Sequence, residues 1–209
     1  MPEQYVTENY MESGGDRWIL NGTMDREGAP VLPVATLQAQ LVQHYQVAPA
    51  TVSATAIHAA VTLADGEETE ITDEITNPDV PRVLAVKGNA AGITGDVVIE
   101  GTNILDEEVT DTIALSGTSS VNGVVAFKTV TGITFPARNA EADTVTVGTN
   151  KLIGIPHIVY NAACLLVKLF NGSADSGSLT VDADEVEKNF FTMNGAPDGA
   201  KLLDLFYLV

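Results

Sequence analysis

The feature that most restricts the fold of this chain is a repeated alternation of apolar and polar residues with a period of two. The clearest apolar rows are Ile57, Ala59, Val61 and Leu63, then Val145 and Val147, then Leu179 and Val181. Successive side chains of a strand point to opposite faces, so each row predicts a strand with one buried and one solvated face. No comparable helical period interrupts them, and the chain is expected to be all-β.

Turn dipeptides separate these rows and indicate how the strands connect. They are Asp65-Gly66, Asn122-Gly123, Asn171-Gly172 and Asp198-Gly199. Such pairs tolerate the positive φ of tight hairpins, which predicts antiparallel neighbours. Between two of them, residues 124–135 place Val125, Phe127, Ile133 and Phe135 on one side of one long strand or two. The expected fold is an antiparallel β-sandwich, either immunoglobulin-like or of the jelly-roll kind, with its topology open.

The last eight residues, 202–209, are almost entirely apolar. An exposed tail of this composition would promote aggregation, so we expect a strand that is paired along its length. Its partner lies either in the same chain or in a neighbouring subunit.

The chain divides into three expected regions: an N-terminal segment (1–32), a short helix with a linker (33–54) and a β-sandwich domain (55–209). The helix is predicted over residues 34–45, because Val34, Leu37 and Leu41 follow Pro33 at helical spacing. About three turns are marginally stable alone. The helix is therefore expected to pack either on the body or on copies of itself.

Charge restricts the possible partners. The chain has 28 acidic and 10 basic residues, a formal charge of -18. A negative surface argues against binding nucleic acid or an anionic membrane, and suits a soluble protein or one that docks on a basic scaffold. The first ten residues lack the pattern of a signal peptide, and no apolar run approaches the roughly 20 residues of a membrane span. Synthesis in a cytoplasm is expected.

The sequence offers no recognisable catalytic, cofactor-binding or metal-binding motif, and the chain is not expected to be an enzyme. Its histidines, His44, His58 and His157, are scattered, and Cys164 stands in an apolar run, as a core thiol does. Acidic clusters occur at 67–70, 106–108 and 182–185. Calcium at the last cluster stays open, although solvated acidic loops are commoner.

Two segments resemble proteins of tailed bacteriophages. Residues 10–29, with Gly14-Gly15-Asp16-Arg17-Trp18-Ile19-Leu20 followed by Gly22 and Gly28-Ala29, resemble the opening of head-fibre proteins. Further along, residues 76–82, 97–103, 126–133 and 143–156 are similar to a β-sandwich module of tailed-phage virion proteins. Together the segments touch about half of the chain.

The resemblance implies a capsid decoration or head-fibre protein on the outer surface of the virion. Its partner would be the major capsid protein, bound through residues 10–29, with the sandwich projecting outward. The implied capsid-binding residues are Arg17, Trp18, Ile19, Leu20 and Arg26. A homo-oligomer is expected, with a trimer favoured over a monomer. The alternatives are a surface adhesion or carbohydrate-binding module that contacts a host glycan, a glycan hydrolase, and a tail-associated structural protein.

Overall fold

The computed structural model describes residues 10–11, 18–19 and 41–209. The chain forms two compact units, Met1–Gln40 and Leu41–Val209. In the first unit, β1 (Tyr10–Met11) and β2 (Trp18–Ile19) form an antiparallel pair in which Tyr10 lies opposite Ile19 and Met11 opposite Trp18. We call the second unit the body, and the remainder of the fold concerns it alone.

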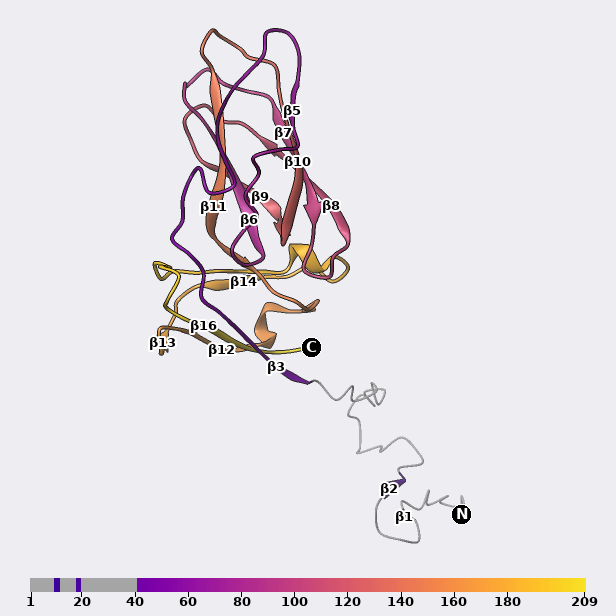
Figure 1. The fold of residues 1–209 in the computed structure, drawn as a ribbon. Coiled ribbons are helices and arrows are strands. Elements are labelled where there is room, and N and C mark those ends of the chain that lie inside the picture. Colours follow the sequence, from indigo (N-terminus) through magenta and orange to yellow (C-terminus); the bar gives the residue numbers. More distant parts are fainter. Residues whose placement is uncertain (1–9, 12–17, 20–40) are drawn as a thin grey trace, which may run out of the picture. The chain divides into compact units, whose positions relative to one another are not determined.

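The body is all-β, and each of its strand pairs is antiparallel (Figure 1). Its first strands are β3 (Val42–Val47), β4 (His58–Thr62), β5 (Thr69–Ile71), β6 (Arg82–Gly88), β7 (Asp96–Thr102), β8 (Glu108–Ala114), β9 (Val121–Phe127) and β10 (Thr129–Phe135). They are followed by β11 (Thr144–Gly154), β12 (Leu165–Phe170), β13 (Ser173–Ala174), β14 (Ser178–Thr180), β15 (Phe190–Thr192) and β16 (Leu203–Leu208). Two short 3-10 helices, η1 (Ala162–Cys164) and η2 (Val186–Lys188), complete it. No helix in this described part is long and apolar enough to cross a membrane.

Three sheets build two lobes, each with its own apolar core. In the acidic lobe (residues 54–149), the sheet β5-β10-β7-β8 packs against β4, β6, β9 and the first half of β11. In the terminal lobe (residues 41–53 and 150–209), the sheet β13-β12-β16-β3 packs against β14, β15 and the end of β11. The largest buried side chains include Phe127 and Phe135 in the first core, and Phe191 and Tyr207 in the second. This arrangement agrees with the expected β-sandwich character.

Strand β11 belongs to both lobes. Its first part, Thr144 to Thr149, pairs with β6, whereas Leu152 to Gly154 pair with β15. Accordingly, Val145 and Val147 are buried in the first core and Ile153 in the second. One continuous strand thus carries the backbone from one core into the other.

The alternation in the sequence located most of these strands, although Ala59 of the first row is exposed. Val145 and Val147 are fully buried, and Leu179 is buried between exposed Ser178 and Thr180. Residues 124–135 divide between β9 and β10, with the four predicted apolar side chains in the core. The apolar end of the sequence forms β16, which pairs with β12 on one side and β3 on the other, both within the chain.

One expected turn is a strand instead. Asn122-Gly123 lies inside β9, at an edge of the six-stranded sheet and beside β8, the edge strand of the opposite sheet. Asp111 of β8 accepts hydrogen bonds from the backbone N–H groups of Val124 (2.8 Å) and Val125 (3.1 Å). A Cβ at position 123 would lie 2.0 Å from the Asp111 Oδ2 atom. Glycine is therefore needed here because a carboxylate closes the edge of the sandwich.

The predicted helix over residues 34–45 is wrong where the structure describes it. From Val42 to Tyr45 the chain is part of β3, whose six residues pair in continuous register with β16. Residues 34–40 lie outside the described residues. Pairing with the apolar strand β16 stabilises this segment more than a short helix would, because isolated helices of this length have little stability of their own. The body accordingly begins at Leu41, within the region expected to be a short helix with a linker.

The apolar run around Cys164 was expected to be core, and only part of it is. Cys164 and Leu165 are half-buried against the second core, but Leu166 and Val167 are 51% and 40% exposed. The register of β12 on β16 shifts between Leu165 and Val167, so that β12 places apolar side chains on both faces of its sheet. Of the other turn dipeptides, Asn171-Gly172 joins β12 to β13 with positive φ at both residues.

Candidate functional site

The five residues implied as a capsid anchor fall in the N-terminal unit. Trp18 and Ile19 form β2, and their backbones pair with Met11 and Tyr10. Arg17, Leu20 and Arg26 lie outside the described residues. The structure thus places two of the five next to one another on a short hairpin strand.

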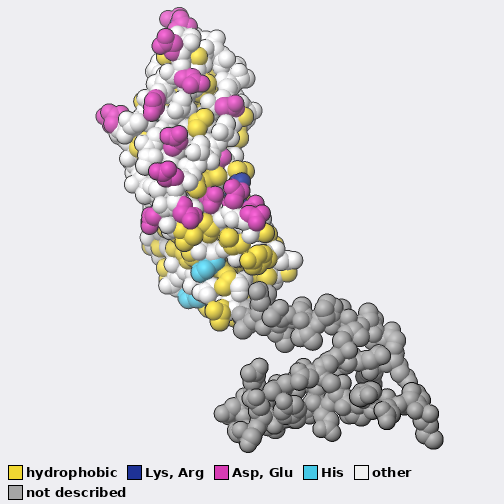
Figure 2. Space-filling view, turned by 90° about the vertical axis from the view of Figure 1, so that its right-hand side faces the viewer, with side chains coloured by type: hydrophobic (Ala, Val, Ile, Leu, Met, Phe, Trp, Pro, Cys, Tyr) yellow, Lys and Arg dark blue, Asp and Glu magenta, His cyan; other side chains and the backbone are white. Residues whose placement is uncertain are grey.

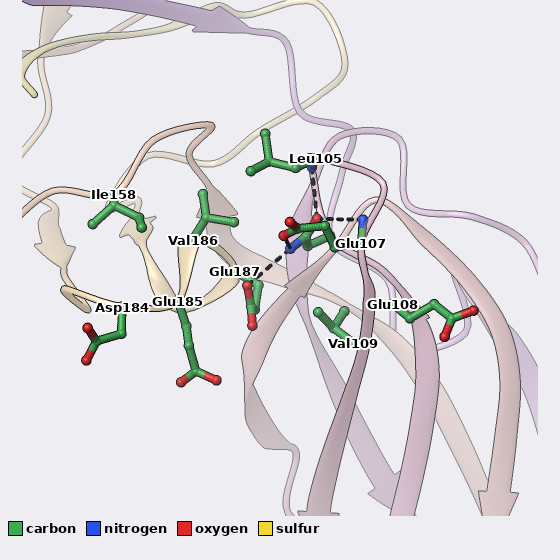
Figure 3. Close-up of a pocket in the computed structure, with 10 residues that line it drawn as sticks. Leu105, Glu107, Glu108, Val109, Ile158, Asp184, Glu185, Val186 and Glu187 are labelled. Carbon is green, nitrogen blue, oxygen red and sulfur yellow. Dashed lines mark hydrogen bonds between the residues drawn. The ribbon is translucent and has the colours of Figure 1, made fainter.

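The body contains a surface pocket of about 460 Å³ where the two lobes meet (Figure 3). One wall comes from the connection between β7 and β8 and the start of β8, in the acidic lobe. The other wall comes from η2 and Ile158, in the terminal lobe. Five of the lining residues are acidic: Glu107, Glu108, Asp184, Glu185 and Glu187. Apolar side chains, among them the exposed Leu105, line the remainder.

Asn103 joins the two walls of this pocket. Its side-chain Nδ2 donates to Glu107 Oε2 at 3.0 Å and to Glu187 Oε2 at 3.2 Å, while its Oδ1 accepts from the backbone N–H groups of Leu105 and Glu107. The residue is almost fully buried. In Figure 3 the Glu107 and Glu187 side chains meet at this point, and those of Asp184 and Glu185 point away from it. A single amide thus holds two carboxylates from different lobes.

The pocket's carboxylates do not form a metal centre. Within the described part of the chain, no group of three or more histidine, cysteine, aspartate or glutamate side chains is placed to hold a metal ion. Asp182, in the cluster where calcium was left open, instead accepts hydrogen bonds from the N–H groups of Asp184 and Glu185 at 2.9 Å each. These donors lower the pKa of Asp182. Its carboxylate therefore stabilises the turn that leads to η2.

A second polar cluster is buried around Arg82, at the start of β6. The Arg82 side chain is fully buried, and donates to Asp79 Oδ2 at 2.9 Å and to the Asn150 carbonyl at 3.3 Å. Burial lowers the pKa of Arg82, although the charge of Asp79 opposes this shift. The Tyr45 hydroxyl of β3 belongs to the same cluster, and burial raises its pKa to about 12 against the effect of Arg82. An ion pair thus anchors the junction of the lobes.

The third histidine of the sequence contacts the core of the terminal lobe. His157 Nδ1 lies 2.8 Å from the Tyr207 hydroxyl, and the rings meet edge to face at a centroid distance of 5.7 Å. Burial lowers the pKa of His157 and favours its neutral form. The Nδ1 atom of a neutral imidazole accepts a hydrogen bond from the buried phenol, which satisfies a hydroxyl group near the end of β16.

Charge is unequally divided between the lobes. The acidic lobe has 15 acidic and four basic residues, whereas the terminal lobe has seven and four. In Figure 2 the Asp and Glu side chains are spread over the acidic lobe, while apolar side chains gather over the terminal lobe. The exposed apolar residues of the terminal lobe include Leu41, Val42, Tyr160, Leu166, Val167 and Leu202.

The sequence did not predict either polar cluster. Residues 106–108 and 182–185 were recognised as acidic, but nothing in their spacing shows that they face each other across a pocket. Arg82 stands in an apolar stretch, and an isolated arginine there is the one local signal of a buried pair.

Comparisons of this chain with protein-family models, with curated proteins and with solved structures find no match.

Proposed function

We propose that this chain is a non-enzymatic structural protein of a tailed-phage particle, a decoration or head-fibre protein bound to the outside of the capsid. Residues 1–32 attach it to the major capsid protein, and the β-sandwich projects outward. The protein acts as a homo-oligomer. A carbohydrate-binding role on the same particle is the alternative.

The observation that carries this proposal is the division of charge within the body. The body begins at Leu41, immediately before β3, in the less acidic terminal lobe. The acidic lobe has a formal excess of eleven negative charges, and such a surface repels other acidic surfaces. This polarity suits a surface protein with one attached end.

The likeness of residues 10–29 to head-fibre proteins supports the position of the attachment. Trp18 and Ile19, on β2, supply the aromatic and aliphatic side chains that are typical of interface anchors, and Arg17 supplies a charge for pairing. Binding to the assembled shell alone stabilises that shell by mass action, because a ligand of one state shifts the equilibrium toward it. The action is mechanical, since bound copies link capsid subunits.

Co-sedimentation of the purified full chain with phage heads that lack it tests this proposal. We expect the wild-type chain to sediment with heads, and Trp18→Ala to weaken binding by about 30-fold or more, as truncation of an interface anchor does. A matched control is Glu67→Gln, which changes an exposed side chain of the acidic lobe and is expected to leave head binding unchanged.

The proposal fails if the wild-type chain does not bind heads although it is folded by circular dichroism. Such a result would direct attention to tails or to host glycans. Equal binding by wild type and Trp18→Ala would show that Trp18 does not contribute to head binding. Arg17→Ala and Arg26→Ala would then test the rest of the segment.

A further inference from the structure

Strand β3 lies at the edge of its sheet. It pairs with β16 on one side, and within the described residues no strand pairs with its other side. The two longest other edge strands, β8 and β9, face each other and are tied together by Asp111. An open edge of six residues presents backbone donors and acceptors to any strand that reaches it.

The hydrogen bonds to β16 show which groups of β3 are free. Leu41 and Val209 exchange two backbone bonds, of 3.3 and 3.1 Å, and the pairing continues in register to Val47. In an antiparallel ladder the bonded residues alternate, so residues 41, 43, 45 and 47 point their backbone groups toward β16. Val42, His44 and Gln46 therefore point theirs to the open edge. Within the described residues, no backbone or side-chain group forms a hydrogen bond with the backbone N–H or C=O groups of these three residues.

The sequence of this edge lacks the usual protection against pairing. Residues 42–47 (VQHYQV) contain no proline and no lysine, aspartate or glutamate. Their side chains on the outer face are already fixed: His44 Nε2 lies 3.0 Å from Asp204 Oδ1, and the His44 ring stacks on Phe206 at 4.2 Å. A strand that adds to β3 thus meets an ordered surface.

We propose that the occupant of this edge is β3 of a second copy of the chain, paired antiparallel about a two-fold axis at His44. In this register His44 faces His44, and Val42 faces Gln46 in both directions. The free N–H and C=O groups of all three residues are then satisfied, in six hydrogen bonds. A shift of two residues, with His44 opposite Gln46, satisfies only two of the three. The edge is thus complementary to itself.

The position of β3 also suits a contact between identical chains. It lies in the terminal lobe, whose formal excess is three negative charges rather than eleven, so repulsion between copies is smaller there. Pairing would cover the neighbouring Val42, whose side chain is 58% exposed. The result is an eight-stranded sheet across two chains. This two-fold contact is independent of the proposed capsid attachment, and it is not the contact of a trimer.

The register is tested by cysteine cross-linking of the full chain in a Cys164→Ser background. Hydrogen-bonded residues opposite each other have Cα atoms about 5.5 Å apart, within the range of a disulfide. We expect His44→Cys to give a disulfide-linked dimer on oxidation. Gln46→Cys is the matched control, because the two positions 46 are offset by four residues, about 14 Å, and should not link. Both variants remove one contact to Asp204.

Sedimentation velocity of the wild-type chain is expected to show a concentration-dependent dimer. Gln46→Pro removes an edge-facing N–H group without removing a bond to β16, and should shift the chain to monomer, whereas Gln46→Ala keeps the dimer. A wild-type chain that is monomeric at all concentrations overturns the proposal, as does cross-linking at position 46 in place of 44. If Gln46→Pro does not fold, the cross-linking of His44→Cys compared with that of Gln46→Cys tests the proposal.

Discussion

The two lobes of the body use the same residue type for different purposes. In the terminal lobe, Asp175, Asp182, Asp198 and Asp204 each accept several hydrogen bonds, and the pKa of each is lowered. The acidic lobe has twice as many carboxylates as the terminal lobe, and those at the connection of β4 to β5 are exposed to solvent. These four carboxylates of the terminal lobe therefore fix local structure, whereas those at the connection of β4 to β5 supply surface charge.

Asp175 shows how a turn is organised in the terminal lobe. Burial alone would raise its pKa, but backbone N–H groups of Asn194, Gly195 and Gly177 donate to its carboxylate and outweigh that effect. In the acidic lobe a lowered carboxyl pKa occurs at Asp65, where the Arg138 guanidinium binds it in the open. The hydrogen bonds to Asp175 fix the backbone of a turn. The ion pair of Asp65 with Arg138 joins two side chains at the surface and contributes little to the free energy of unfolding.

The largest expected effects test whether the two cores unfold together. Phe127→Ala in the acidic lobe and Phe191→Ala in the terminal lobe each remove a fully buried ring, and each should lower the free energy of unfolding by about 3–5 kcal/mol. Because β11 enters both cores, we expect one cooperative transition in urea, followed by circular dichroism, for both variants. Two separate transitions, of which each variant shifts only one, would show that the lobes are independent.

The next effect concerns the closed edge of the acidic lobe. Gly123→Ala brings a methyl group against the Asp111 carboxylate, and overpacking of this kind should lower the free energy of unfolding by about 1–3 kcal/mol. Gly132→Ala in β10 is the control, since its nearest contact would be Glu100 Oε2 at 3.5 Å. Urea unfolding of both variants measures the difference. Equal stability of the two would mean that Asp111 does not close this edge.

Acid should affect the hydrogen-bonded carboxylates of the terminal lobe. Donation from the Lys201 backbone N–H, the Lys201 side chain and the Ala200 N–H lowers the pKa of Asp198 to about 2 from its ordinary 3.8. A pKa lowered by folding gives stability that is present above pH 4 and is lost as the pH falls toward 2. Asp198→Asn should therefore flatten the decline in unfolding free energy between pH 4 and pH 2, measured by urea titration at each pH. Parallel curves would contradict this.

The smallest effect is expected for the surface carboxylates of the acidic lobe. Glu67→Gln combined with Glu68→Gln alters two exposed side chains, and should change the free energy of unfolding by less than about 0.5 kcal/mol. Thermal unfolding at low and at high salt measures it. A loss comparable with that of Gly123→Ala would mean that these side chains have a structural role, and would remove the distinction between the lobes.

The sequence predicted the parts of this fold that depend on local patterns. Alternation located Val145, Val147 and Leu179 in cores, because a strand with one wet face leaves that pattern in any sequence. Local reasoning failed where a distant residue overrides a local pattern. Asn122-Gly123 has the composition of a hairpin turn, and only the approach of Asp111 explains its place in a strand.

Candidate sites were harder to predict than strands. Glu107 and Glu187 are 80 positions apart in the sequence and share one donor, Asn103, and no spacing rule relates them. The free edge of β3 could not be predicted from the sequence either. The pairing of Leu41 with Val209 decides which backbone groups of β3 face outward, and that pairing is not visible in local patterns. Both features arise from the tertiary arrangement, which periodicity does not encode.

The bonds between Leu41 and Val209 have a practical consequence for protein fusions. Because residues 41 and 209 lie side by side, a fluorescent protein or peptide tag joined after Val209 would begin beside Leu41, where β3 and β16 start to pair. It would crowd this end of the sheet. The connection containing Asp65 and Gly66, in the acidic lobe, is the better insertion point, because Gly66 has open space around it and Asp65 is exposed. Cargo inserted there would leave the pairing of β3 with β16 undisturbed.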